Sequence, residues 1–273
     1  MQERIRYIEA LSSVVKDKIS GGIDSRVRSL DLFEYRRARR IIDLSIRGIE
    51  VEPIPPFLKE EERAILVSNY PSVTKTTRAV LKVGCRLPGE KSRLKAIARK
   101  EIVTEANLFL KAIGVDTLVF PAEKDKFGIY KLESKARKEI LIYLGKPGHV
   151  VWLSVTGETR GNGLLEEDLR TGAAMFSLMS RAPIVPMGVV TEEKKGKTRV
   201  VKIKFGEPIH LPKKVDKVDL VEFEIGDLLV DYSRLAMCRI AELLPPGQRG
   251  SFENTEEKLA EINKRLEAYQ LRT

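Results

Sequence analysis

The sequence contains few of the residues that build metal centres and disulfide frameworks. Only two histidines, His149 and His210, and two cysteines, Cys85 and Cys238, occur among its 273 residues. This scarcity excludes a histidine-rich metal site, and the two distant cysteines match no metal-ligand spacing. Cysteine usage of this kind favours a reduced, cytoplasmic setting over a disulfide framework.

Long hydrophobic runs are also missing. No apolar stretch approaches the roughly 18–20 residues that a membrane span requires. Residues 1–18 include acidic side chains and no apolar core, so the sequence predicts no secretory signal there. The chain has no Gly-x-Ser-x-Gly elbow, no Walker loop and no Gly-x-Gly-x-x-Gly after a strand. These absences argue against hydrolases, nucleotidases and dinucleotide-dependent enzymes.

Basic residues, in contrast, are abundant and unevenly placed. The formal net charge is +10, with 42% hydrophobic and 32% charged residues, which is typical of a soluble globular protein. Between Lys75 and Lys138 there are 16 Lys and Arg against 7 Asp and Glu, a local charge of +9. Such a field favours anionic partners, namely phosphate groups, coenzyme A, a membrane surface or nucleic acid. A solvated basic face is the alternative interpretation.

The pattern of apolar residues divides the chain into three parts. Residues 1–47 are expected to form a helical N-terminal extension, whose second helix, Ser29–Ile46, is basic and amphipathic. Such a helix either lies on an anionic membrane or packs on its own domain. Residues 48–211 are expected to form an α/β domain, and residues 212–273 a helical C-terminal tail with helices at Val218–Leu244 and Asn254–Leu271.

Strands and helices are expected to alternate in the middle part. After a Pro-rich connector at Glu50–Lys59, the pattern predicts strands at 64–68, 116–121, 149–155, 184–190 and 198–205. It predicts helices at 76–83, 101–113, 132–144 and 164–180, and a charged loop at Glu192–Lys197. Leu94–Ala98 fits a strand or a short helix. This alternation is typical of an α/β fold with a largely buried sheet.

Two polar segments follow strands in this part. Asn69-Tyr70-Pro71-Ser72-Val73-Thr74-Lys75 joins the strand at 64–68 to the following helix. Residues 155–163 follow the strand at 149–155 and contain Arg160 followed by two glycines. Backbone N–H groups and a guanidinium at the carboxyl end of a strand suit an anion site. An ordinary turn is the alternative for this loop.

These segments resemble, in order, motifs of the glycerolipid acyltransferase family, whose type member acylates 1-acylglycerol-3-phosphate. The first family motif reads Asn-His-x-Ser-x-x-Asp. Asn69 and Ser72 match it, whereas Tyr70 stands at the His position and Lys75 at the Asp position.

The second family motif reads Phe-Pro-Glu-Gly-Thr-Arg. Thr159 and Arg160 match it, and Glu158 falls one position after the family Glu. Two further segments resemble the family's Lys-x-Gly-Ala helix and its Pro-Ile-Val-Pro strand, namely Thr171–Ala174 and Ala182–Met187. The resemblance spans residues 47–211.

The resemblance implies a mixed sheet flanked by helices. In the family, the His takes a proton from the glycerol hydroxyl, and the alkoxide attacks an acyl thioester on coenzyme A or acyl carrier protein. By the same resemblance, Arg160 would bind the phosphate of the acyl acceptor, supported by Asn69, Ser72, Glu158 and Thr159. No metal or bound cofactor is implied, and acyl-CoA or acyl-ACP would be the co-substrate.

The replaced His and Asp leave three hypotheses open. The first is a pseudoenzyme of phospholipid metabolism that binds an anionic phospholipid or lysophospholipid, an acyl thioester, or both, at the inner face of the membrane. The second is an active acyltransferase in which Lys75 lowers the pKa of Tyr70 to make a tyrosinate base. The third is RNA binding through the basic segment, although aromatic residues for base stacking are sparse there.

Overall fold

The centre of the fold is a seven-stranded sheet with the order β1-β9-β8-β2-β7-β3-β4. The computed structural model describes residues 48–59, 62–87, 93–99, 116–120, 122–124, 130–132, 134–155, 164–194, 197–212 and 222–271. The strands of the sheet are β1 (Glu50–Val51), β2 (Ala64–Ser68), β3 (Leu94–Arg99), β4 (Asp116–Phe120), β7 (Val150–Ser154), β8 (Ile184–Lys194) and β9 (Lys197–Phe205). A separate short ribbon pairs β5 (Ala122–Lys124) with β6 (Tyr130–Leu132).

The sheet is mixed, as the sequence predicts. Strands β8, β2, β7, β3 and β4 are parallel to one another, whereas β8 and β9 form an antiparallel pair. Every residue of β2 is buried. A parallel strand covered on both faces needs apolar side chains at each position, which explains why β2 and β7 read as continuous apolar runs.

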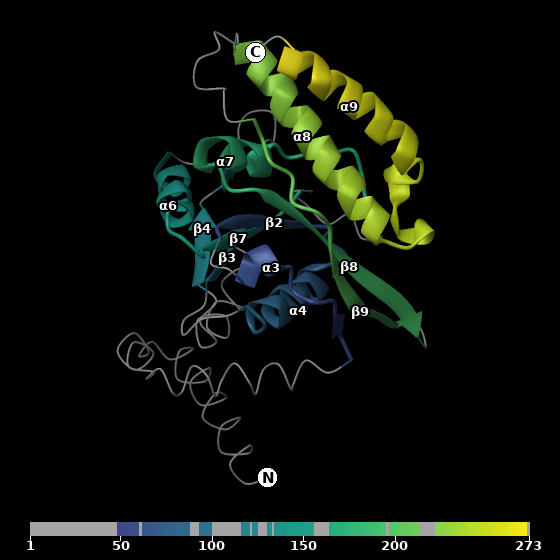
Figure 1. Cartoon of the computed structure of the whole chain (residues 1–273). Helices are drawn as coiled ribbons and strands as arrows, with labels where there is room; N and C mark the ends of the chain where they lie inside the picture. Colours follow the sequence, from purple (N-terminus) through teal and green to yellow (C-terminus); the bar gives the residue numbers. More distant parts are fainter. Residues whose placement is uncertain are drawn as a thin grey trace, which may run out of the picture.

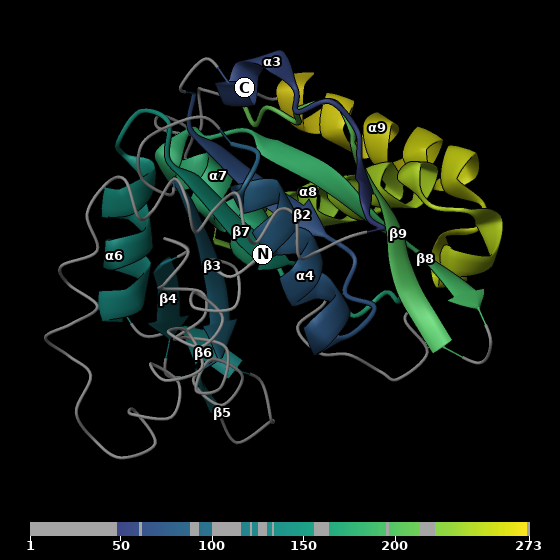
Figure 2. The ribbon, with the colours of Figure 1, turned by 90° about the horizontal axis from the view of Figure 1, so that it is seen from below.

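Helices cover both faces of the sheet (Figure 1; Figure 2). One face carries α4 (Val73–Gly84), and the other carries α7 (Gly172–Ser180) and α8 (Glu222–Leu243). Because strand side chains alternate between faces, Ala64 and Leu66 pack in the core beside α4. Ile65 and Val67 pack in the core beside α7 and α8. The short helix α3 (Pro56–Lys59) and α6 (Ser134–Leu144) complete the layers.

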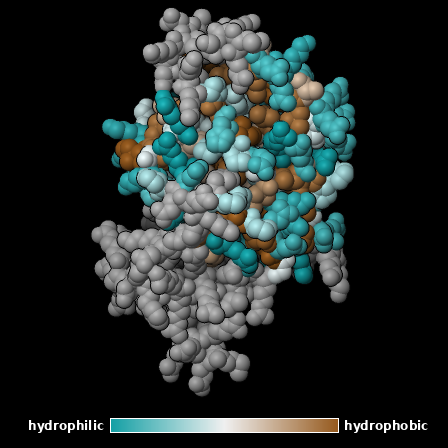
Figure 3. Space-filling view, viewed as in Figure 1, coloured by the Kyte–Doolittle hydropathy of each residue, from teal (hydrophilic) through white to brown (hydrophobic). Residues whose placement is uncertain are grey.

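The C-terminal helices share the core of the sheet. Ala236 and Ile240 of α8 lie in the same buried cluster as Ile65. Two 3-10 turns, η3 (Pro246–Gln248) and η4 (Gly250–Phe252), lead from α8 to α9 (Thr255–Leu271). The outer side of α9 is covered by polar side chains (Figure 3). Residues 222–271 therefore form part of the packed structure of residues 64–205.

Most of the predicted elements within the described residues are confirmed. The strands β2, β4, β7, β8 and β9 and the helices α4, α6, α8 and α9 lie where the sequence predicts them. Leu94–Ala98, whose pattern fits either a strand or a short helix, is part of the strand β3. The expected helices of residues 1–47 and 101–113 lie outside the described residues.

The predicted helix at Leu164–Ser180 is wrong in its first half, because α7 begins only at Gly172. The carbonyl of Leu165 accepts the N–H of Ser251 at 2.9 Å, and the N–H of Arg170 donates to the carbonyl of Val155 at 3.0 Å. Tertiary contacts thus take up backbone groups that a helix would pair internally.

The predicted charged loop at Glu192–Lys197 is also wrong. The ladder between β8 and β9 continues through it to the pair Lys194–Lys197. Glu192 lies opposite Arg199 across this ladder, and opposite charges at facing positions support strand pairing. The Pro-rich connector Glu50–Lys59 also contains two short elements that the sequence does not predict. These are β1, which pairs in parallel with β9, and α3.

Candidate functional site

The polar segments that follow β2 and β7 begin at the same edge of the sheet. Ser68 at the end of β2 lies in register with Ser154 of β7 and with Met187 of β8. In open α/β sheets, ligands bind at the carboxyl ends of parallel strands. The fold therefore brings the residues that follow Ser68, Asn69 and Tyr70, to the same edge of the sheet as Val155, the residue that follows Ser154.

Tyr70 is packed on the sheet. Its ring stacks on that of Trp152, with 6.4 Å between centroids and 25° between planes. Tyr70 is half-buried and contacts the apolar cluster beside α4. Trp152 in turn donates its Nε1–H to Oγ of Ser68 at 3.0 Å. Tyr70, which the sequence resemblance aligns with the family's His, is thus a packed aromatic residue.

Asn69 is bound to the backbone of the neighbouring strand. Its Oδ1 accepts the N–H of Val189 at 2.7 Å, and its Nδ2 donates to the carbonyl of Val189 at 2.9 Å. The residue is only 2% exposed. Asn69 therefore extends the contact between β2 and β8 by one step beyond the end of β2, and this is a structural role.

Ser72 and Lys75 form the start of α4. The N–H of Lys75 donates to Oγ of the N-cap residue Ser72 at 3.3 Å, a contact that stabilises a helix start. An acidic residue in the first helical turn interacts favourably with the helix dipole, whereas a lysine does not. Lys75 therefore supplies neither the charge nor the helix stabilisation of the family's Asp.

The structure points to one residue that the sequence analysis missed, Arg170. Its N–H bonds the carbonyl of Val155, where the described chain breaks off before the segment that contains Glu158, Thr159 and Arg160. Those three residues lie outside the described residues. The Arg170 guanidinium is 3.4 Å from Asp168, and its Nε is buried with no hydrogen-bond partner among the described residues. A sequence signal for Arg170 was available. The segment Arg170-Thr171-Gly172-Ala173 matches the family's Lys-x-Gly-Ala pattern, with an arginine in place of the lysine.

A buried hydroxyl lies one turn into α4. The residue Thr76 is 0% exposed, and its Oγ1 has no hydrogen-bond partner among the described residues. Ala79, Val80 and Val83 are the buried residues that follow it at helical spacing, so Thr76 lies on the face that packs on the sheet. An unpaired buried hydroxyl next to the candidate site carries an energetic cost.

Both histidines lie away from the candidate site by position in the fold. His149 precedes β7 at the amino end of the strand, as the sequence predicts. Its ring lies against Tyr143 with 4.1 Å between centroids, and its Nδ1 is 3.0 Å from the Tyr143 carbonyl. Burial lowers the pKa of His149; the bond to the Tyr143 carbonyl opposes this, and the nearby cations Lys146 and Lys95 add to it. His210 follows β9 and is exposed.

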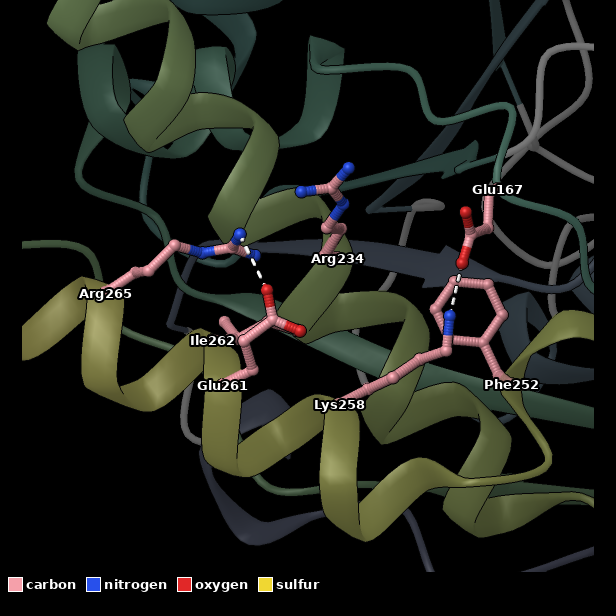
Figure 4. A pocket seen from close by; sticks show the side chains of 7 residues that line it. All are labelled: Glu167, Arg234, Phe252, Lys258, Glu261, Ile262 and Arg265. Atoms are coloured by element: carbon pink, nitrogen blue, oxygen red, sulfur yellow. Dashed lines mark hydrogen bonds and ion pairs between the residues drawn. The ribbon is translucent and has the colours of Figure 1, made fainter.

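A pocket of about 280 Å³ lies between α8, α9 and the segment that precedes α7 (Figure 4). Seven residues line it: Glu167, Arg234, Phe252, Lys258, Glu261, Ile262 and Arg265. Lys258 bonds Glu167, and Arg265 bonds Glu261 at 3.0 Å and the buried Asp231 at 3.0 Å. The hydrogen bond from Lys258 lowers the pKa of Glu167. These charged side chains pair with one another. Their ion pairs connect α9 to α8 and to Glu167.

Two kinds of site are absent from the described part of the chain. No group of three or more His, Cys, Asp or Glu side chains there is arranged to hold a metal ion. None of the described helices combines the length and the apolar content that crossing a membrane requires.

Comparisons with known proteins gave a likeness in structure but none in sequence. No protein-family model matches the chain, and no curated protein matches its sequence. The structure is similar to the crystal structure of the 1-acyl-sn-glycerophosphate (LPA) acyltransferase PlsC from Thermotoga maritima, with 15% sequence identity and a TM-score of 0.46. The match covers 88% of this chain and 93% of that chain.

Proposed function

We propose that the protein binds a phosphate-bearing acyl acceptor of the lysophospholipid type at the carboxyl ends of β2 and β7, without the acyl-transfer chemistry of a His–Asp pair. The observation that carries the proposal is the stacking of Tyr70 on Trp152. A residue that replaces the general base and packs against the sheet suits a binding protein that does not carry out the family's proton transfer.

The chemistry of the replaced pair supports this view. A general base works best when its pKa lies near the working pH, and a tyrosine has a reference pKa near 10. The family's Asp stabilises the protonated His by its negative charge, which the cationic Lys75 does not supply. Two substitutions at the expected pair, Tyr70 and Lys75, thus remove both the base and its partner.

Two arginines are the proposed ligands of the phosphate. Arg160 matches the family's phosphate-binding arginine in sequence, and Arg170 is joined by its backbone to Val155 at the start of the same segment. A guanidinium binds a phosphate through two parallel hydrogen bonds. The side chain of Arg170 is 32% exposed, and its buried Nε has no hydrogen-bond partner among the described residues.

The single tryptophan of the chain provides a direct test. Trp152 lies under Tyr70 at the proposed site, so its fluorescence should respond to a bound ligand. We expect 1-acylglycerol-3-phosphate, below its micelle concentration, to change Trp152 emission saturably. The matching monoacylglycerol, which lacks the phosphate, should leave the emission unchanged. An equal response to both lipids, or none to either, would refute the proposal.

Substitution of the arginines sharpens this test. A hydrogen bond to a charged group contributes about 1.5–3 kcal/mol, so Arg160→Ala and Arg170→Ala should each weaken binding by about 10- to 100-fold. Arg239→Ala is the matched control, because Arg239 lies on α8 and pairs with Glu242 at the surface. The control should bind as the unmodified protein does.

Acyl transfer is tested separately by the release of thiol from acyl-CoA in the presence of the same lipid. We expect no release above the background of Tyr70→Phe. Release that depends on the Tyr70 hydroxyl would instead support an enzyme with a Tyr70–Lys75 base, and would reject the non-catalytic part of the proposal.

The proposal includes a peripheral association with anionic membranes. The basic segment Lys75–Lys138 supports it, because clustered Lys and Arg are attracted to anionic lipid surfaces. Sedimentation with vesicles of phosphatidylglycerol and phosphatidylcholine should capture the protein at low salt and release it at high salt. Equal capture by vesicles of phosphatidylcholine alone would argue against this association.

A further inference from the structure

One edge of β8 extends beyond the strand that covers it. β2 ends at Ser68, whose partner on β8 is Met187, while β8 continues to Lys194. On its other side β8 pairs with β9 along this whole stretch. The backbone groups of β8 that face away from β9 beyond Met187 therefore need partners other than β2.

Two side-chain amides supply these partners. Val189 exchanges both of its backbone hydrogen bonds with the amide of Asn69. Two residues further on, the N–H of Thr191 donates to Oε1 of Gln248 at 3.1 Å, and Nε2 of Gln248 donates to the carbonyl of Thr191. Residues two apart in a strand direct these groups to the same side, so Asn69 and Gln248 bind adjacent positions of one edge.

The two amides come from different parts of the molecule. Asn69 belongs to the segment that carries Tyr70, whereas Gln248 is the last residue of η3, the turn that follows α8. That turn is itself held in place, since the N–H of Gln248 donates to the Pro245 carbonyl at 2.9 Å and Nε of Arg249 donates to the Leu244 carbonyl at 3.0 Å.

The end of α8 also presses directly on β8. A Cβ atom placed on Gly188 would lie 2.7 Å from Cβ of Leu243, so only glycine allows this approach. Gly188 directly precedes Val189, the residue that Asn69 binds. The C-terminal helices therefore contact β8 on both sides of the residue that anchors the candidate site.

We infer that Gln248 is a positioning residue for the proposed lipid site, which it orders through Thr191, β8 and Asn69. This inference rests on the proposed function for its ligand, but its structural part can be measured without any ligand. When the Gln248 amide is removed, the backbone N–H and carbonyl of Thr191 lose their hydrogen-bond partners. This loss loosens the contact of Val189 with Asn69 and, through Asn69, the packing of Tyr70 on Trp152.

The first experiment uses the free protein. Gln248→Ala should make Trp152 about twofold more accessible to acrylamide quenching in the native state. A double-mutant cycle of Asn69→Ala with Gln248→Ala should show coupling of at least threefold in the unfolding equilibrium constant. Additive effects together with unchanged quenching would overturn the inference. If Gln248→Ala fails to fold, Gln248→Glu replaces it, because the carboxylate still accepts the Thr191 N–H but turns a second acceptor oxygen toward the Thr191 carbonyl.

The second experiment uses the lipid. Gln248→Ala should weaken 1-acylglycerol-3-phosphate binding about fivefold at a temperature where the variant is fully folded, and Gln248→Glu, which cannot donate to the Thr191 carbonyl, should weaken it as well. Glu253→Ala, at an exposed position after η4, is the control with unchanged binding. A lowered unfolding midpoint with unchanged affinity would mean that Gln248 is only structural. If the unmodified protein binds no lipid, the proposed function fails, while quenching and coupling still decide the role of Gln248.

Discussion

The ring of Tyr70 stacks on that of Trp152, with 6.4 Å between their centroids, directly after the strand whose last residue, Ser68, accepts the hydrogen bond of Trp152. The side chain at the expected base position is thus part of the apolar packing beside α4. This arrangement predicts that the ring of Tyr70, more than its hydroxyl, is what the fold requires.

Truncation of Tyr70 tests that prediction. Tyr70→Ala should lower the free energy of unfolding by about 2 kcal/mol, because a half-buried aromatic ring and its stacking contact are lost. The emission of Trp152 should shift to longer wavelength as water reaches its ring. Tyr70→Phe, which keeps the ring, should stay within about 1 kcal/mol of the unmodified protein. Equal losses for the two variants in urea unfolding would contradict a packing role.

The buried hydroxyl of Thr76 leads to a prediction of the opposite sign. Thr76→Val keeps the shape of the side chain and removes a buried hydroxyl that has no hydrogen-bond partner among the described residues. The variant should therefore be more stable by about 1 kcal/mol. Thr76→Ser, which keeps the hydroxyl and leaves a small cavity, serves as the control and should be less stable. A loss of stability in Thr76→Val would mean that the hydroxyl has a partner.

The sequence predicts much of this fold because its central strands are continuously apolar. β2 and β7 are buried on both faces, so burial alone dictates their composition. The start of α7 could not be predicted in the same way. The carbonyl of Leu165 bonds Ser251, and a contact between such distant residues leaves no periodic pattern in the sequence.

The strand–helix junction that carries Asn69 and Ser72 was predictable from the sequence, but its side-chain contacts were not. The positions of Asn69 and Ser72 after a strand and before a helix placed them at the sheet edge, and the structure confirms that junction. The binding of Asn69 to Val189 spans 120 residues, and that of Gln248 to Thr191 spans 57. Such side-chain bonds to a strand edge depend on where β2 ends relative to β8, which only the packed structure decides.

The buried carboxyl of Asp231 predicts a dependence of stability on pH. The side chain is 5% exposed and lies 3.0 Å from Arg265. Burial raises its pKa above the ordinary value, although Arg265 and Arg234 act in the opposite direction. A raised folded-state pKa means that the protonated group favours folding. This stabilisation is complete below the unfolded pKa of about 3.9 and is lost as pH rises through the folded value.

Comparison with Asp231→Asn isolates this effect, because the amide is neutral at every pH. The stability of the unmodified protein relative to Asp231→Asn should be greatest below the unfolded pKa of about 3.9 and should decrease as the pH rises through the folded value. Urea unfolding at several pH values measures the difference, and Glu256→Gln at an exposed position of α9 controls for general charge effects. A difference that grows with pH would mean that Arg265 dominates and that the pKa of Asp231 is lowered.

The two cysteines should differ sharply in reactivity. Cys238 is fully buried on α8, and burial raises the pKa of its thiol to about 11. Cys85 is half-buried at the end of α4. Because the thiolate is the reactive form, Cys238 should react with a disulfide reagent at pH 8 only as fast as the protein unfolds, and Cys85 should react first.

In Cys85→Ser the early phase should vanish, and in urea both thiols of the unmodified protein should react rapidly. Rapid native-state reaction in Cys85→Ser would show that α8 opens locally, and the packing of α8 against the sheet would then be weaker than its burial indicates.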